Sequence, residues 1–330
     1  MEQKQNKIDT HTINLIKIID INTLVISGGS IKGYLFIGTI KLLFELDIIK
    51  KIKYFYGTSF GGILITCLNL GWDIDEILKF SINFPIDCII DCDIDNFINN
   101  YGLVPQTNYE TIFKQIITYK NFNENITFKE LYDQTHKELN LITYSIKDNA
   151  TVILNHETMP DLMIWQGLYM TAALPVLIPP FEYKNNLYID GGISENFPIE
   201  RVKPENKYKT IGISTGCYKT DWDKLKKNMI HKDILNYLEY SLELIKILFT
   251  KPKLYNIQNC IRLNLSDGNS IFNSIDFTIP TCEKQKIINH GYNQSLEQLS
   301  DVLNCIHKKQ IDQYKSINQN ICKFSKYNEI

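Results

Sequence analysis

One pattern occurs twice in the first seventy residues and restricts the fold more than any other feature of the chain. A short apolar run leads into a glycine turn, and a stretch with apolar residues at helical spacing follows. The first copy spans residues 21–46 and the second spans residues 54–70. Strand, glycine turn and helix in direct repetition are typical of a parallel sheet with helices packed on it. The sequence therefore predicts an α/β fold with a mostly parallel central sheet.

The rest of the chain continues this alternation and then changes character near residue 215. Beyond that point it consists mainly of long helical stretches, near 231–249 and 283–310. We therefore expect a flexible N-terminal tail over 1–19, one α/β domain over 20–215, and a C-terminal helical part over 216–330 that packs on the same domain. Short β-branched runs within the domain predict further strands at 139–146, 151–154, 186–189 and 210–214.

Charge and hydropathy exclude several classes of protein. The formal net charge is −2, and nucleic-acid binding needs a concentrated basic face, so we expect no nucleic-acid partner. No apolar run approaches the roughly 20 residues of a membrane span, and Lys17 and Asp20 interrupt the long run near the N-terminus. Residues 1–12 are polar and lack the apolar region of a signal peptide. We expect a cytoplasmic protein whose contact with membranes is peripheral.

Eight cysteines are scattered along the chain, several of them in apolar stretches with helical spacing. With no signal peptide before them, free thiols in a reducing compartment are a better interpretation than disulfides. Cys88 and Cys92 lie four residues apart, but no second pair of cysteines or histidines is close to them in the sequence. We therefore predict no zinc site there and no metal or cofactor elsewhere.

The second glycine turn has the sequence Gly57-Thr58-Ser59-Phe60-Gly61. A nucleophilic serine on a strand-to-helix turn needs a tight backbone, and flanking glycines remove side chains that would collide with neighbouring elements. The following helix directs its N-terminus toward the negative charge that develops during acyl transfer. The strand before this turn and the apolar helix after it favour Ser59 as a nucleophile over a serine that occurs there by chance.

The first glycine turn contains Gly28, Gly29 and Ser30 and opens a helix at Gly33. Consecutive glycines let main-chain N–H groups converge on one point, where they can stabilise an oxyanion. A dinucleotide-binding loop would need a glycine where this chain has Ser30, and lysines fill the region in which that fold places an acidic residue. A plain helix N-terminal turn without a ligand is the remaining alternative.

A nucleophilic serine needs a base, and histidine is the usual one. None of the histidines after Ser59 lies in a glycine-framed turn, and His156 is the only candidate in a loop. Asp190, by contrast, ends a short strand and is followed by Gly191 and Gly192. Desolvation can raise the pKa of such a carboxylate into the working range of a general base. By itself, an Asp-Gly pair is more often an ordinary turn. The histidines concerned are His136, His156, His231, His290 and His307.

Together the three motifs resemble the patatin-like phospholipase family. Ser59 follows Gly29 by 30 residues and Asp190 follows Ser59 by 131 residues, in the order that the family shows. The similarity extends over roughly residues 22–215. It includes the stretches Tyr101–Pro105, Ile126–Leu131, Ala172–Pro180 and Asn196–Pro198.

The resemblance implies a three-layer α/β/α fold and a calcium-independent Ser59–Asp190 dyad that forms an acyl-enzyme. It also implies an oxyanion hole made by the N–H groups of Gly28, Gly29 and Ser30, and a phospholipid or another lipid ester as substrate. The chain departs from the family at Ser30, where a third glycine is usual, and at Lys32, where arginine is common. Serine keeps its N–H, but its side chain narrows the acyl entrance or its backbone needs an unfavourable φ.

Three functions of different kinds follow. The leading hypothesis is a phospholipase A-like lipid acyl hydrolase. The second is a catalytically weak or inactive member of the family that binds lipid or a protein partner, and Ser30 is the residue that favours it. The third is an esterase with a Ser-His-Asp triad, in which His156 or a later histidine would be the base.

Overall fold

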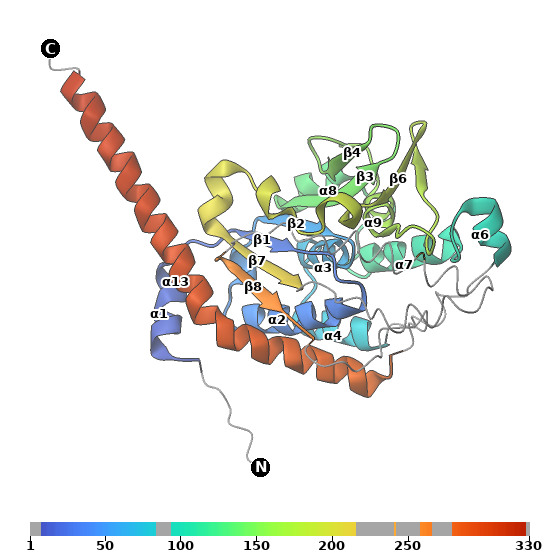
Figure 1. Ribbon diagram of the computed structural model, residues 1–330, viewed down its shortest axis with the longest axis horizontal. Helices are drawn as coiled ribbons and strands as arrows, with labels where there is room; N and C mark the ends of the chain where they lie inside the picture. The colour runs from blue at the N-terminus through green and yellow to red at the C-terminus, as the bar shows by residue number, and fades with distance from the viewer. Residues whose placement is uncertain (1–7, 84–93, 216–240, 242–257, 266–278, 328–330) are drawn as a thin grey trace.

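The computed structural model describes residues 8–83, 94–215, 241, 258–265 and 279–327 (Figure 1). Within these residues one eight-stranded sheet has the order β5-β6-β3-β2-β1-β7-β8, and β4 pairs with β3 outside this path. The strands are β1 (Thr23–Ile26), β2 (Tyr54–Thr58), β3 (Glu138–Ser145), β4 (Ala150–Leu154), β5 (Phe181–Tyr183), β6 (Asn186–Asp190), β7 (Thr210–Thr215) and β8 (Cys260–Leu263).

The centre of the sheet is parallel, as predicted. Strand β1 lies between β2 and β7, and both of these neighbours run parallel to it. All four of its residues are buried, which is typical of a strand covered on both faces. Strand β8 comes from beyond residue 215, and the sequence did not predict it.

The antiparallel part of the sheet lies around β3. The strands predicted at 139–146 and 151–154 are confirmed, and they form a hairpin in which β3 and β4 pair antiparallel on either side of the turn at 146–149. Strand β6 also pairs antiparallel with β3, and β5 pairs with β6. Asp190 is therefore the last residue of a strand that runs against the direction of β3.

Helices cover both faces of the sheet. The α-helices are α1 (Thr10–Ile18), α2 (Gly33–Glu45), α3 (Phe60–Asn69), α4 (Ile74–Asn83), α6 (Ile94–Asn100), α7 (Gln106–Thr118), α8 (Phe128–Thr135), α9 (Ile164–Ala172), α10 (Gly192–Glu195) and α13 (Thr281–Tyr327). Short 3₁₀ segments are η1 (Ser30–Lys32), η2 (Ile49–Lys51), η3 (Pro198–Arg201) and η4 (Pro204–Lys209). In the described part of the chain, no helix is both long enough and apolar enough to cross a bilayer.

Neighbouring residues of β1 enter different layers, because side chains alternate between the faces of a strand. Leu24 and Ile26 belong to the main core, which contains the buried residues of α2, α3 and α9. Val25 packs on the opposite face with Tyr56 and with Ile199 of η3. The expected three-layer α/β/α architecture is confirmed.

The C-terminal helix packs on the same body as the sheet. Helix α13 runs along α2 and α4 and then continues away from the sheet toward the C-terminus (Figure 1). A Cβ atom at Gly38 of α2 would lie 2.1 Å from the carbonyl oxygen of Ile288, and one at Gly291 would lie 2.2 Å from that of Leu35. The two helices therefore meet backbone to backbone, which only glycine permits at these positions.

Two expectations about the ends of the chain are wrong. Thr10–Ile18 is a helix rather than part of a flexible tail over 1–19, because it buries Leu15 and Ile16 and packs against α13. Helix α13 continues to Tyr327 instead of ending near residue 310. The helix predicted at 231–249 lies outside the described residues, apart from the helical Ser241.

Candidate active site

Ser59 occupies a sharp turn between β2 and α3. Its backbone has φ 52 and ψ −126, a conformation that costs a non-glycine residue about 1–3 kcal/mol. The flanking glycines allow the turn to pass close to β1, because a Cβ atom at Gly61 would lie 2.4 Å from the carbonyl oxygen of Ser27. Gly57 is equally restricted, since its Cβ atom would lie 2.8 Å from the carbonyl oxygen of Gly61. The predicted strand, tight turn and helix around Ser59 are present.

Strands β2 and β6 end head to head along β3. Thr58, the last residue of β2, pairs with Ile142, and Asp190, the last residue of β6, pairs with Thr143. Both strands use the same edge of β3, because β4 occupies the opposite edge at Ile142 and Thr143. Ser59 follows Thr58 directly, so the sheet brings it to Asp190 although 131 residues separate them in the sequence.

The Asp190 carboxylate is buried, accepts a hydrogen bond from a main-chain N–H group and interacts with the Ser59 hydroxyl. Only 1% of the residue is exposed. Burial raises the pKa of Asp190 to about 7, and hydrogen bonds from the Ser59 hydroxyl and from the Gly192 N–H act in the opposite direction. The Gly192 N–H donates to Oδ1 at 2.8 Å. The carboxylate is therefore in contact with the predicted nucleophile and has the raised pKa expected of a general base.

The glycine loop lies beside Ser59, and one of its predicted oxyanion donors is already in use. A Cβ atom at Gly28 would lie 3.4 Å from the Cβ atom of Ser59. The Gly28 N–H donates to the main-chain oxygen of Asn196 at 2.9 Å, and the Asn196 side-chain amide donates to the Gly28 oxygen at 3.3 Å. Asn196 therefore holds the Gly28 peptide on both sides. The assignment of Gly28 to the oxyanion hole is corrected, because its N–H group is committed to the protein.

Ser30 has the unfavourable backbone that the sequence comparison led us to expect. Its φ is 46, in the left-handed region that favours glycine, which is the physical reason for a third glycine in the family pattern. Its side chain is exposed, and the residue opens the 3₁₀ segment η1. Serine at this position therefore strains the loop, and helix α2 begins three residues later at Gly33.

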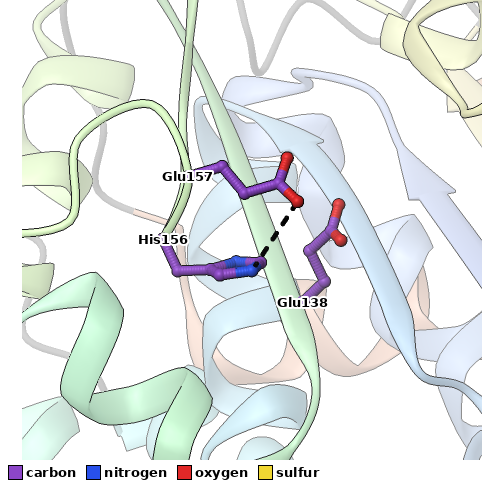
Figure 2. Close-up of side chains that lie close together, drawn as sticks. All are labelled: Glu138, His156 and Glu157. Carbon is purple, nitrogen blue, oxygen red and sulfur yellow. Dashed lines mark ion pairs between the residues drawn. The ribbon is translucent and has the colours of Figure 1, made fainter.

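His156 lies at the other end of the sheet, in contact with Glu157 and near Glu138 (Figure 2). Glu138 pairs with Tyr54 at the start of β2. Ser59 is five residues further along the chain, which corresponds to about 16 Å along a strand. The His156 ring also stacks on Tyr132 at 3.7 Å between centroids. The structure therefore contradicts the use of His156 as the base for Ser59.

The same three side chains are the one group among the described residues with the composition of a metal site. A lysine ammonium group lies between the two carboxylates, however. Lys203 Nζ is 3.0 Å from Glu138 Oε2 and 3.4 Å from Glu157 Oε1. This position is thus filled by a cation that the chain itself supplies. The predicted absence of a zinc site at Cys88 and Cys92 concerns positions outside the described residues.

One residue that contacts the nucleophile was missed in the sequence. Thr171 of α9 accepts a hydrogen bond from the Ser59 N–H through its hydroxyl at 3.0 Å. It directly precedes the small-residue stretch that resembles the family approach to Asp190. The position of Thr171 next to this stretch was the only signal in the sequence. A threonine within a helical pattern does not by itself indicate a hydrogen bond to Ser59.

Comparisons with known proteins agree with this fold and these motifs. The family profile described as "Patatin-like phospholipase" matches residues 24–203, more than half of the chain. The chain is similar to "Probable lipid hydrolase 463L" of Invertebrate iridescent virus 6, with 35% identity over 193 residues, covering 56% of this chain and 64% of that protein. It is also similar to "Triacylglycerol lipase 5" of Saccharomyces cerevisiae, with 29% identity over 220 residues, covering 54% of this chain and 27% of the lipase.

The chain thus spans less than two thirds of either of these relatives. Among solved structures, VipD from Legionella pneumophila shares the fold, with a TM-score of 0.55 and 19% identity over 85% of this chain and 67% of that chain. The profile match includes both glycine turns and the Asp190 turn. The chain therefore belongs to the patatin-like phospholipase family.

Proposed function

We propose that this protein is a lipid acyl hydrolase in which Ser59 is the nucleophile and Asp190 is its general base. The observation that supports this most strongly is that the Ser59 hydroxyl lies close enough to the buried Asp190 carboxylate to lower its pKa. A carboxylate in water is a weak base for a hydroxyl, but desolvation makes it a stronger one. The family assignment supports an ester of a lipid as the substrate.

The proposed reaction has two halves. Asp190 takes the proton of the Ser59 hydroxyl while the oxygen attacks the ester carbonyl, and the resulting tetrahedral intermediate expels the alcohol, which receives the proton from Asp190. In the second half, Asp190 takes a proton from water while the water oxygen attacks the acyl-enzyme, and the second tetrahedral intermediate expels the Ser59 oxygen, which recovers its proton from Asp190 as the fatty acid is released. This sequence uses no calcium, because Asp190 moves every proton and main-chain N–H groups are the proposed stabilisers of the oxyanion.

The oxyanion needs main-chain donors close to Ser59. With Gly28 committed to Asn196, the proposed donors are the N–H groups of Gly29 and Ser30, supported by the N-terminus of α3. Each donor of this kind lowers the barrier by roughly 3 kcal/mol. Phospholipids and triacylglycerols both carry the carboxylic ester that this chemistry requires, and the viral and yeast relatives are named for lipid and triacylglycerol hydrolysis.

A fluorophosphonate probe and a mixed lipid substrate test the proposal together. Wild-type protein should take the label and release fatty acids, identified by mass spectrometry from phospholipid and triacylglycerol mixtures. Ser59→Ala should take no label, and Asp190→Asn should remain folded while ester turnover falls on the order of 10⁴-fold, as in other hydrolases that lose a member of the catalytic pair. Full turnover in either variant would refute the assignment. His156→Ala is the control, and it should keep labelling and turnover because its ring lies at the opposite end of the sheet.

The alternative is a family member that binds lipid without hydrolysing it. Two observations favour it: Ser30 replaces the third glycine, and the Gly28 N–H is engaged by Asn196. Folded wild-type protein that sediments with lipid vesicles but takes no label would establish this alternative over the hydrolase.

A further inference from the structure

The Ser59 peptide lies where two regular hydrogen-bonding patterns end. Strand β2 stops pairing with β3 at Thr58, and the N–H group of the residue before a helix has no partner within that helix. The residue is also held at φ 52. A strained peptide keeps such a conformation only if its surroundings determine it, so the partner of the Ser59 N–H is decisive for the position of the hydroxyl.

That partner is the Thr171 hydroxyl, and its hydrogen bonds leave it no freedom to rotate. It accepts from the Ser59 N–H at 3.0 Å and donates to the main-chain oxygen of Ile142 at 2.5 Å. An N–H group can only donate and a carbonyl oxygen can only accept, so both roles are fixed. Thr171 is 0% exposed, and water therefore cannot replace either bond.

The same turn of α9 also holds the other member of the pair. The Asp190 N–H donates to the carbonyl oxygen of Ala173 at 2.9 Å. Two residues of one segment therefore fix both Ser59 and Asp190, and the Thr171 hydroxyl attaches that segment to β3 through Ile142, which pairs with Thr58.

We propose that Thr171 is a positioning residue, whose hydroxyl holds the Ser59 peptide in its positive-φ conformation and thereby sets the separation of the Ser59 and Asp190 side chains. This inference rests on the proposed function. Thr171 touches neither the reacting ester nor the proton that moves, and it acts through the Ser59 backbone. A displacement of about 1 Å at a reacting group can lower the rate on the order of 100-fold.

Two substitutions separate the hydroxyl from the packing of this side chain. Thr171→Val keeps the branched shape, including the methyl group near Gly62, but removes the hydroxyl. Thr171→Ser keeps the hydroxyl and removes the methyl group. We expect kcat and the rate of fluorophosphonate labelling to fall roughly 10- to 100-fold in Thr171→Val with KM within about 3-fold of wild type, and Thr171→Ser to recover most of that loss.

Thr210→Val is the matched control. Thr210 is also buried and its hydroxyl donates to the Asn206 carbonyl oxygen, but it lies at the start of β7, away from the carboxyl ends of the strands. It should lose stability without a change in kcat. Equal kcat in Thr171→Val and wild type, or equal losses in Thr171→Val and Thr171→Ser, would overturn the proposal.

A second measurement keeps this inference separate from the proposed function. Hydrogen exchange at the Ser59 amide should be slow in wild type and Thr171→Ser, and at least about 10-fold faster in Thr171→Val, because only the valine variant leaves this N–H without its partner. If wild-type protein takes no label, the hydrolase proposal fails and this exchange experiment still decides the role of Thr171. Unchanged exchange in Thr171→Val refutes it. If the valine variant does not fold, Thr171→Cys, which has a similar volume and a weak hydrogen-bonding thiol, replaces it in the same comparison.

Discussion

Each end of the central sheet holds a buried carboxylate, and the two carboxylates have very different surroundings. At the amino end of β3, Glu138 accepts from the Lys203 ammonium group at 3.0 Å and from the Asn140 amide at 3.0 Å. At the other end, the contacts that act on Asp190 in the described structure are a hydroxyl and an N–H group. A buried charge is normally neutralised by a partner. The comparison shows that Glu138 has a cationic partner, whereas Asp190, the proposed base, is held by neutral donors.

The largest expected effect is a pH dependence of the free energy of unfolding that is caused by Asp190. Because folding raises the pKa of Asp190 from 3.8 to about 7, the native state binds a proton that the unfolded state releases between these values. Stability therefore falls as pH rises through this window, by about 1.4 kcal/mol per pH unit and about 4 kcal/mol in total. Asp190→Asn does not titrate and should be more stable than wild type above pH 7, with little difference near pH 4.

Chemical denaturation of both proteins from pH 4 to pH 8 measures this difference. In wild type, ester turnover should rise over the upper part of the same window, because only the ionised carboxylate can accept the Ser59 proton. A constant stability difference between the two proteins across this range would show that Asp190 is neutralised in the way Glu138 is, and the contrast between the two ends would disappear.

A smaller effect is expected at the Glu138 end. Lys203→Met leaves Glu138 buried without its cation, which should cost about 2 kcal/mol of unfolding free energy after allowance for the partial exposure of the lysine. Turnover by the folded fraction should not change, because this cluster lies at the opposite end of the sheet. The control is Lys129→Met, which removes an exposed ion pair with Asp133 and should cost less than about 0.5 kcal/mol. Equal losses in the two variants would mean that burial of Glu138 has no consequence.

The smallest expected effect concerns strain in the glycine loop. Ser30→Gly relieves a left-handed backbone at φ 46 and should raise the unfolding free energy by about 1 kcal/mol, with turnover equal to or above that of wild type. Ser300→Gly, in the interior of α13, is the matched control and should lose about 0.5 kcal/mol, because glycine is a poorer helix former than serine. A loss in Ser30→Gly would show that the loop is not strained at this residue.

Local patterns predicted the parts of the molecule that depend on neighbours in the sequence. The repeated strand, glycine turn and helix at 21–46 and 54–70 were correctly predicted, because apolar spacing and glycine turns carry that information. The meeting of Ser59 with Asp190 could be inferred only through the family resemblance. It depends on where β2 and β6 stop along β3, and nothing near either residue encodes that register.

The errors have a common cause in tertiary contacts. The Gly28 N–H looked available in the sequence but is used by Asn196, which lies 168 residues away. Thr10–Ile18 was predicted to be part of a flexible tail, although it forms a helix that packs against α13. Strand β8 is only four residues long and gains its place from pairing with β7. In each case the partner, and not the local sequence, decides the structure.

The head-to-head ending of β2 and β6 has a consequence for how sequences of this kind can diverge. Residues inserted at the exposed turn between β5 and β6, at Lys184 and Asn185, would change the register of that hairpin but not the pairing of β6 with β3, so the site would stay intact. A shift of β6 by one position along β3 would instead turn the Asp190 side chain to the other face of the sheet. The lengths of the connecting segments can therefore vary among related sequences, whereas the register of β2 and β6 on β3 has to be conserved.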